Sequence, residues 1–359
     1  MQRCAVATRS EMRAVAPTHY PHPWLAANCS LIFPGFGQLY RGQVLKGSLF
    51  AIATGSLISF LIWSIFAADG NTVQGLWAIA SLLTLYGWSI FDALGQKGLS
   101  HGAKPSQGGS YDPWYTAFLS QVLPGLGHLY LQRVGVGSLL LFVGIGSALL
   151  TQTYPSLLPI PVLIWTFGCY HGYHIALPSH RHRHPLIWMI VLGMVVLRLT
   201  VGAIPAWVNL TVEQCIVPSA SMVPTLQIND RLFVRHQADY RPQVGDVVVF
   251  KVPVTAQQLD DTEPDTLIVK RIIALPGQTV QVTQGQVFVN QQPISESYIA
   301  EPPAYEWGPN LIPPDQFFVL GDNRNASSDS HRWGFLVKDL IIGKAYKIYW
   351  PPARISALS

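Results

Sequence analysis

Five long apolar stretches within the first 208 residues restrict the fold of this chain more than any other feature. They cover residues 48–67, 75–95, 137–153, 157–176 and 186–208. A helix needs roughly 17–25 mainly apolar residues to cross a bilayer, so each stretch predicts a membrane span, the third and fourth near the short limit. Only 12% of all residues are charged. After residue 208 apolar and polar residues alternate, which predicts a separate folded domain.

Lysine and arginine are unevenly distributed over the connections between these stretches. They occur before the first, between the second and third, and between the fourth and fifth, as Arg3, Arg9, Arg13, Arg41, Lys46, Lys97, Lys104, Arg133, Arg181 and Arg183. The alternate connections, 69–71 and 154–156, contain none. The positive-inside rule therefore predicts a cytoplasmic N-terminus and export of everything after residue 208. Arg198, within the fifth stretch, is expected to face other helices or to snorkel.

The same pattern predicts how the chain is divided. The expected parts are a cytoplasmic tail (1–23), a first membrane hairpin (24–100), a cytoplasmic linker (101–113), a second membrane hairpin (114–178), a transmembrane anchor (186–208) and an exported domain (209–359). The tail has no apolar core, so it is not expected to be a cleavable signal peptide.

One motif occurs twice, ahead of the first and third stretches. Residues 34–40 are P-G-F-G-Q-L-Y and residues 124–130 are P-G-L-G-H-L-Y, and Gly-Ser-Leu follows each copy. The motif resembles that of small bacterial two-helix membrane modules. We expect the glycines to let a turn pack closely against its neighbour; a ligand or partner site is the alternative. A phosphate cradle is excluded, because the lysine that it needs is missing.

Histidines gather between the fourth and fifth stretches. The run 180–184 is H-R-H-R-H, with His171 and His174 upstream. The arginines of this run favour its interpretation as a basic segment that sets the orientation of the fifth span by charge alone. No Asp, Glu or Cys nearby completes a ligand set, so no metal site is predicted.

The last 150 residues predict an all-β domain. Expected strands lie at 231–234, 247–251, 267–274, 279–282, 286–289, 317–320 and 344–350. Turn residues separate them, and Gln284-Gly285 predicts a hairpin. Residues 254–266 are expected to form a polar loop and 301–314 an irregular excursion. Cys215 is the only cysteine of this half, so no disulfide framework is expected there.

Two serines lie between two prolines at residues 218–226, P-S-A-S-M-V-P-T-L. Proline fixes φ and restricts the preceding residue, which predicts a stiff, extended backbone with Ser219 and Ser221 on one face. One hydroxyl could attack a carbonyl while the other donates a hydrogen bond. A serine hydroxyl needs a neighbouring base to become a strong nucleophile.

Lys270 is the candidate base. Alternation within residues 267–273, L-I-V-K-R-I-I, puts it on the face of Ile268 and Ile272. A lysine held on an apolar face loses hydration, so its pKa falls and the amine can accept a proton. A snorkelling strand lysine is the simpler interpretation. A Ser-His-Asp triad is the competing chemistry; His236 and His331 are available, but neither has a recognisable triad context.

Four blocks in order resemble the bacterial type I signal peptidases, the serine-lysine proteases of family S26. They are P-S-x-S-M-x-P-T-L (218–226), G-D-V-V-V-F (245–250), K-R-x-x-x-L-P-G (270–277) and G-D-N-R-x-x-S-x-D-S (321–330). The resemblance covers residues 186–351 and implies an all-β catalytic domain after the membrane helices. The family commonly has one or two spans, so nothing is implied for the first four.

The resemblance also implies a role for each matching residue. Ser221 would be the nucleophile and Lys270 the general base. Ser219 would join the Ser221 N–H in the oxyanion hole, and Ser327 would orient the lysine amine. The expected supporting residues are Arg271, Asp322, Arg324 and Asp329. His331 stands where the family usually has Arg, which weakens an ion pair with Asp329 unless Arg332 substitutes.

The implied activity is cleavage of signal peptides after small residues, of the A-x-A type, with no metal or organic cofactor. The expected partners are preprotein signal peptides, the lipid bilayer and the secretion translocon; nothing in the sequence predicts nucleic-acid binding. A self-cleaving serine-lysine repressor protease is disfavoured by the five spans. A catalytically inactive membrane scaffold built on the repeated hairpin is the alternative from another class.

Overall fold

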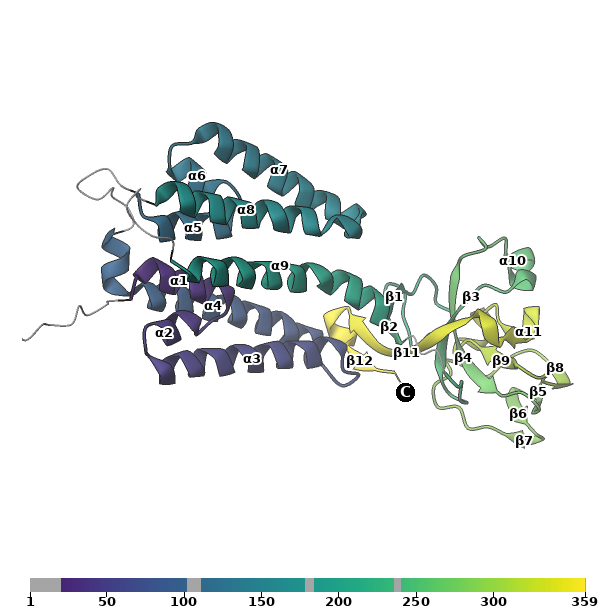
Figure 1. Ribbon diagram of the computed structural model, residues 1–359. Helices are drawn as coiled ribbons and strands as arrows, with labels where there is room; N and C mark the ends of the chain where they lie inside the picture. Colours follow the sequence, from purple (N-terminus) through teal and green to yellow (C-terminus); the bar gives the residue numbers. More distant parts are fainter. Residues whose placement is uncertain (1–20, 102–110, 178–183, 236–239, 359) are drawn as a thin grey trace, which may run out of the picture. The chain divides into compact units, whose positions relative to one another are not determined.

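The computed structural model describes residues 21–101, 111–177, 184–235 and 240–358. The chain divides into two compact units, residues 1–54 with 84–199, and residues 55–83 with 200–359. Helices make up the first unit, and the second combines parts of three long helices with the strands and with two short helices of its own (Figure 1).

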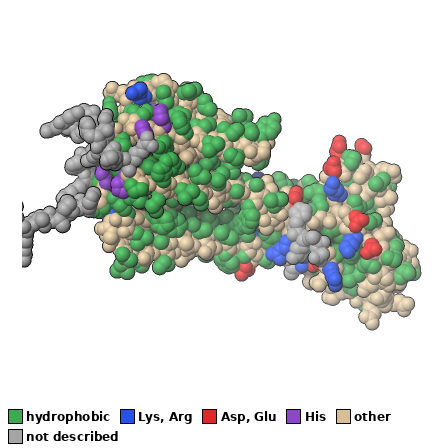
Figure 2. All heavy atoms as spheres, viewed as in Figure 1, with side chains coloured by type: hydrophobic (Ala, Val, Ile, Leu, Met, Phe, Trp, Pro, Cys, Tyr) green, Lys and Arg blue, Asp and Glu red, His purple; other side chains and the backbone are tan. Residues whose placement is uncertain are grey.

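The predicted apolar stretches form helices. The long ones are α3 (Val44–Phe66), α4 (Thr72–His101), α7 (Val134–Thr153), α8 (Pro159–Ala176) and α9 (Leu186–Thr211). Within the described residues four of them, α3, α4 over residues 72–95, α7 and α9, are long and apolar enough to cross a membrane. The fourth predicted span forms α8, which has 18 residues and, with its prolines, histidines and tyrosines, is not among these four. Hydrophobic side chains cover the helices, whereas acidic and basic side chains gather over the strands (Figure 2). The predicted helical membrane region is confirmed.

Both copies of the glycine motif adopt the same structure. Gly35 and Gly125 have φ values of 103° and 90° and precede the short helices α2 (Phe36–Tyr40) and α6 (Leu126–Tyr130). A Cβ atom on Gly35 would lie 2.3 Å from the carbonyl oxygen of Gly47, and one on Gly125 would lie 2.1 Å from that of Gly137. Glycine is therefore required both by the backbone angle and by the close approach. The close-packing interpretation of the repeat is confirmed.

The helices α1 (Pro23–Ile32) and α5 (Pro113–Val122) precede the two motifs and contact each other. Asn28 on α1 donates from Nδ2 to the carbonyl of Trp114 on α5 at 2.9 Å. Arg198 on α9 donates to the carbonyl of Gln121 at 2.6 Å and lies over the ring of Trp165, with 4.3 Å to the centroid. Arg198 thus faces other helices, one of the two placements that we expected.

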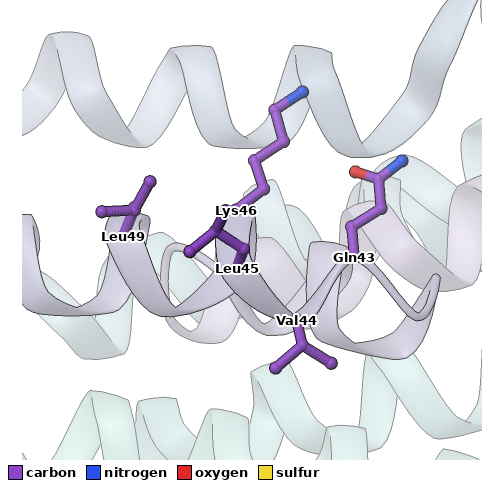
Figure 3. Close-up of a pocket in the computed structure, with 5 residues that line it drawn as sticks. All are labelled: Gln43, Val44, Leu45, Lys46 and Leu49. Atoms are coloured by element: carbon purple, nitrogen blue, oxygen red, sulfur yellow. The ribbon is translucent and has the colours of Figure 1, made fainter.

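A shallow surface cavity of about 480 Å³ lies at the beginning of α3. Its lining residues are Gln43, Val44, Leu45, Lys46 and Leu49 (Figure 3). Lys46 forms an ion pair with Asp92 on α4. None of the predicted catalytic residues lines this cavity, and the active site is elsewhere.

The strands of the second unit form two antiparallel sheets. The larger has the order β1-β2-β11-β3-β4-β9-β10, with β12 paired to β11, and the smaller has the order β7-β6-β5-β8. The larger sheet consists of β1 (Val212–Ile216), β2 (Arg231–Arg235), β3 (Val247–Lys251), β4 (Leu267–Ala274), β9 (Gln316–Leu320), β10 (Leu336–Val337), β11 (Ile341–Trp350) and β12 (Ser356–Ala357). The smaller consists of β5 (Thr279–Thr283), β6 (Gln286–Val289), β7 (Gln292–Pro293) and β8 (Trp307–Leu311).

The β fold predicted from alternation is confirmed, with two local corrections. Residues 254–266 contain the short helix α10 (Val254–Asp260) as well as loop, because Ala256 is buried in the core beside Val252. Residues 301–314 contain β8, which pairs with β5. A further short helix, α11 (Ser330–Trp333), buries Trp333 against Phe250. The local sequence did not indicate these elements, because α10 and α11 are stabilised by the burial of Ala256 and Trp333 and β8 by its pairing with β5.

Candidate active site

Ser221 lies in a turn that follows β1. The Val223 N–H donates to the carbonyl of Ala220 at 3.1 Å, and Leu226 donates to Met222 at 2.9 Å. The prediction of an extended backbone is therefore wrong. Met222 and Leu226 are both buried in the core formed with β2 and β3, and a turn brings side chains four residues apart to the same side. The two serines still meet, because Ser219 Oγ donates to Ser221 Oγ at 3.2 Å.

Lys270 lies in the middle of β4, between β3 and β9. Its neighbours at alternate positions, Ile268 and Ile272, join one apolar cluster, whereas Val269 joins another. This confirms the predicted face of the strand. The lysine is 3% exposed, and its Nζ lies 2.7 Å from Ser221 Oγ. The two predicted reacting groups, 49 residues apart in the sequence, are in hydrogen-bond contact.

Burial determines the electrostatic state of this amine. Loss of hydration lowers the pKa of Lys270 from its ordinary value of 10.5 to about 8, against the opposing effect of Asp329, Asp322 and Asp260. Desolvation disfavours the charged form, and nearby carboxylates favour it. A substantial fraction of the amine is therefore neutral near pH 8, with its nitrogen within hydrogen-bond distance of the Ser221 hydroxyl.

Ser327 lies close to Gly321, the residue that follows β9, and Gly321 in turn lies close to the Ser221 carbonyl. Ser327 is 8% exposed, and a Cβ atom on Gly321 would lie 2.3 Å from Ser327 Oγ and 2.4 Å from the Ser221 carbonyl oxygen. The predicted hydrogen bond to Lys270 is not formed, because Ser327 Oγ has no partner among the described residues. A buried hydroxyl without a partner is costly, so this side chain has hydrogen-bonding capacity left for a reacting state.

Arg271, the next residue on β4, points away from Lys270 and is also buried. Its Nε and Nη2 donate to the two carboxylate oxygens of Asp322 at 2.9 and 2.8 Å. Thr225, from the serine turn, donates to the same carboxylate. The guanidinium also lies over the Tyr298 ring, 4.1 Å from its centroid. This ion pair thus connects the strand that carries Lys270 to the turn that carries Ser221.

Asp329 holds the loop after β9. Its Oδ2 accepts from the N–H of Gly321 at 2.9 Å, and its Oδ1 lies 2.6 Å from Nδ1 of His331. Tyr305 stacks on the His331 ring at 4.0 Å between centroids. The expectation that Arg332 substitutes is wrong, because Arg332 pairs with Asp260 at 3.5 Å. His331 itself takes the place of the arginine, since stacking on Tyr305 fixes its ring beside the carboxylate.

Arg324 has a partner that the sequence did not reveal. It is fully buried and forms a two-pronged ion pair with Glu296, whose Oε2 accepts from Nη1 at 2.7 Å. Its Nε donates to the Gly321 carbonyl at 3.2 Å. Tyr298 donates to Glu296 at 2.8 Å. Glu296 is the only acidic residue between positions 284 and 300. This isolation was the one feature of the sequence that could have indicated a partner for Arg324.

The competing triad finds no support in the described part of the chain. His331 is hydrogen-bonded to Asp329, whereas the contacts of Ser221 Oγ are with Lys270 and Ser219. His236, together with residues 180–183 of the histidine run, lies outside the described residues. Among those described, no three His, Cys, Asp or Glu side chains are grouped to hold a metal ion.

Comparison with known proteins shows the family to which the chain belongs. The family described as signal peptidase, peptidase S26, matches residues 188–350. Signal peptidase I of Leptolyngbya laminosa is 48% identical over 145 residues, which cover 40% of this chain and 70% of that protein. Thylakoidal processing peptidase 1 of Arabidopsis thaliana is 39% identical over 144 residues, 39% of this chain and 42% of the relative.

A solved signal peptidase I from Enterococcus faecalis aligns with 28% identity and a TM-score of 0.25, over 29% of this chain and 97% of that one. The sequence similarity and the long apolar helices define a membrane-associated serine peptidase, a hydrolase. The chain belongs to the signal peptidase family, peptidase S26, whose activity is the cleavage of signal peptides. The match begins at residue 188, so the helices before α9 lie outside it.

Proposed function

We propose that this protein removes signal peptides by a Ser-Lys dyad, with Ser221 as the nucleophile and Lys270 as the general base. The contact of 2.7 Å between the buried amine and the serine hydroxyl carries this proposal. A neutral amine within hydrogen-bond reach of a hydroxyl meets the geometric requirement for a general base, and a pKa near the working pH meets the chemical one.

The proposed reaction has two halves. Ser221 Oγ attacks the carbonyl carbon of the scissile peptide bond as its proton passes to Lys270 Nζ, which gives a tetrahedral intermediate. Its collapse breaks the C–N bond, and the lysine returns the proton to the leaving amine. In the second half Lys270 takes a proton from water, the hydroxide attacks the acyl-enzyme ester, and Ser221 Oγ leaves and regains the proton.

The developing oxyanion needs donors that already point at it. We assign this role to the backbone N–H of Ser221 and the hydroxyl of Ser219, which is exposed and lies beside Ser221. Ser327 has an unpartnered hydroxyl near the dyad and is assigned the orientation of the lysine amine. Arg271, Asp322, Arg324 and Asp329 are assigned the support of the loops around the dyad. Arg271 and Asp322 form one buried ion pair, Arg324 forms another with Glu296, and Asp329 accepts a hydrogen bond from the Gly321 N–H.

The expected substrate is an extended peptide that follows a membrane-embedded apolar segment. From Thr211, where α9 ends, to Ser221 is ten residues, and ten extended residues span about 35 Å at most. The active site is therefore close to the membrane surface. We propose cleavage after small residues, of the A-x-A type, with the peptide added as a strand beside the serine turn.

We propose further that the N-terminus and residues 101–113 are cytoplasmic and that residues 209–359 are exported, with 24–100 and 114–178 as membrane hairpins and 186–208 as the anchor. The charge distribution over the connections supports this topology. Preproteins and the secretion translocon are the proposed partners.

The decisive experiment compares the full-length wild type with Ser221→Ala and Lys270→Met in liposomes, on a preprotein with Ala at the cleavage site. Lys251→Met is a matched control, because Lys251 is an exposed lysine on the neighbouring strand. We expect both dyad variants to lose at least a thousandfold in rate, and the control to stay within twofold. Undiminished cleavage by either dyad variant would refute the mechanism. A preprotein with Phe at the cleavage site tests the preference for small residues, and its equal cleavage would refute that preference.

A further inference from the structure

The domain contains a second buried lysine that the proposed mechanism does not use. Lys347 lies on β11 and is fully buried. Its Nζ donates to the carbonyl oxygens of Ser64, Ile65 and Ala67 at 3.0, 2.9 and 2.8 Å. These carbonyls belong to the end of α3 and the loop after it, about 280 residues earlier in the sequence. Strand β11 of the catalytic domain therefore contacts the C-terminal end of α3.

The acceptors at this point suit a charged amine. The last carbonyls of a helix have no intrahelical partner and carry the negative end of the helix dipole. An ammonium group has three N–H donors, and three carbonyls accept from Lys347. Burial lowers the pKa of this lysine, while the carboxylate of Asp69, in the same loop, acts in the opposite direction.

Aromatic contacts join the same end of α3 to β2 and α9. Phe66, the last residue of α3, stacks on Phe233 of β2 at 5.9 Å between centroids and meets Trp207 of α9 edge-on at 5.8 Å. Thr72, the first residue of α4, donates to the carbonyl of Tyr349 on β11 at 2.8 Å. The α3 end of the α3–α4 connection thus contacts β2 and β11, and the α4 end contacts β11.

The conformation of the α3–α4 loop fixes the position of the carbonyls that accept from Lys347. Ser64 donates from its hydroxyl to the carbonyl of Asn71 and so closes the loop. A Cβ atom on Gly70 would lie 2.5 Å from the Ser64 carbonyl oxygen, which is one of the three acceptors of Lys347. Any larger residue at position 70 would displace that acceptor.

We propose that residues 63–72 form a docking platform for the catalytic domain, and that Lys347 is the positioning residue that locks the domain onto it. Together with α9, the platform gives the domain a second attachment to the membrane helices. The family match starts at residue 188, so the platform is an addition to the shared catalytic part. On the proposed function, the lock fixes Ser221 and Lys270 relative to peptides that leave the bilayer, and it matters for membrane-embedded substrates alone.

The first test measures docking directly and needs no activity. Full-length wild type, Lys347→Met and Lys251→Met in liposomes are compared by amide hydrogen exchange. Methionine keeps the unbranched chain but removes the charge and the donors. We expect exchange of residues 64–72 to rise at least tenfold in Lys347→Met and to stay unchanged in Lys251→Met. Unchanged exchange in a folded Lys347→Met protein would overturn the proposal.

The second test separates positioning from a general structural effect. Each variant is assayed on a preprotein co-embedded in the liposomes and on a short soluble peptide with the same cleavage site. We expect Lys347→Met to lose about tenfold in kcat/KM on the preprotein and less than twofold on the peptide. Equal losses on both substrates would overturn the positioning role. If wild type cleaves neither substrate, the proposed function fails, while the exchange measurement still decides on docking.

A variant on the other side of the contact covers the case in which Lys347→Met does not fold. Phe66→Ser removes the ring that meets Phe233 and leaves the sequence of the β domain intact. It is expected to give the same exchange increase in residues 64–72 and the same split between the two substrates. Full protection of the loop in Phe66→Ser would contradict the platform.

Discussion

Replacing Lys270 by methionine should make the protein more stable at neutral pH while it abolishes activity. The folded protein holds this lysine 3% exposed, where its pKa falls from 10.5 to about 8. At about 1.36 kcal/mol per pH unit, the difference between 10.5 and 8 corresponds to about 3 kcal/mol that charging the amine costs the folded state. The hydrogen bond to Ser221, worth about 1 kcal/mol, is lost in the variant, which leaves a net gain of about 2 kcal/mol.

The sign of the pH dependence follows from proton uptake. The pKa of Lys270 is lower in the folded than in the unfolded chain, so between pH 8 and 10.5 the unfolded chain binds more protons. The stability of the wild type therefore rises with pH across this window. The free-energy cost of burying the charged amine is fully present below pH 8 and absent above pH 10.5. The stability gain of Lys270→Met over the wild type should therefore shrink as the pH rises from 8 to 10.5.

Thermal unfolding of the full-length protein in detergent, followed by tryptophan fluorescence at pH 7, 8, 9 and 10, measures this effect. A gain of about 2 kcal/mol raises Tm by roughly 4–8 °C for a domain of this size. Lys251→Met, which removes an exposed lysine, should leave Tm unchanged at every pH. A lower Tm for Lys270→Met at pH 7, or a difference that does not vary with pH, would refute the view that this amine is desolvated and strained.

Three further predictions concern the same site. Cleavage of a soluble peptide should rise about tenfold in kcat/KM from pH 6 to 7 and level off above pH 8, because the neutral fraction of Lys270 follows its pKa of about 8; a pH-independent rate between 6 and 8 would contradict this role. Ser327→Ala should lower kcat at least tenfold without lowering Tm, since Ser327 Oγ has no partner to lose; a destabilised variant with normal kcat would show a structural role instead. Asp322→Asn should destabilise the domain by about 3–5 kcal/mol, because it removes the carboxylate charge from the buried ion pair with Arg271, whereas Asp265→Asn, at an exposed ion pair, should have no measurable effect on Tm.

Sequence alone predicted the elements whose burial follows their own pattern. The expected strands 247–251 and 267–274 coincide with β3 and β4, because short runs rich in β-branched residues between turn signals favour strands, and consecutive residues of both strands are buried. Alternation pointed to Lys270 as a candidate base, and the four blocks in the family's order then paired it with Ser221. The extended serine segment was predicted wrongly, because the burial of both Met222 and Leu226 outweighs the local stiffness of the prolines.

The contacts that the sequence did not reveal depend on residues that lie far apart in the chain, where at least one partner carries no recognisable motif. Glu296 forms an ion pair with Arg324, which is 28 residues later in the sequence. The residues next to Glu296 form no recognisable motif. His331 pairs with Asp329 in place of Arg332 because Tyr305, from a distant loop, stacks on its ring. The acceptors of Lys347 are backbone carbonyls, which every residue possesses, so no side-chain pattern near Ser64 could have indicated them.

The two buried lysines show why burial alone does not decide the protonation state of an amine. Both are removed from water, and burial lowers the pKa of each. Lys347 meets three carbonyl oxygens, which can only accept hydrogen bonds and so favour the form with three donors. Lys270 meets the Ser221 hydroxyl, which can donate as well as accept, so a lone pair on nitrogen is equally well satisfied. The number and type of acceptors thus make one lysine suited to a structural lock and the other to proton transfer. Adding an acceptor near Lys270 should accordingly move it toward the behaviour of Lys347: Ser221→Asp should keep the amine charged and raise Tm relative to Ser221→Ala.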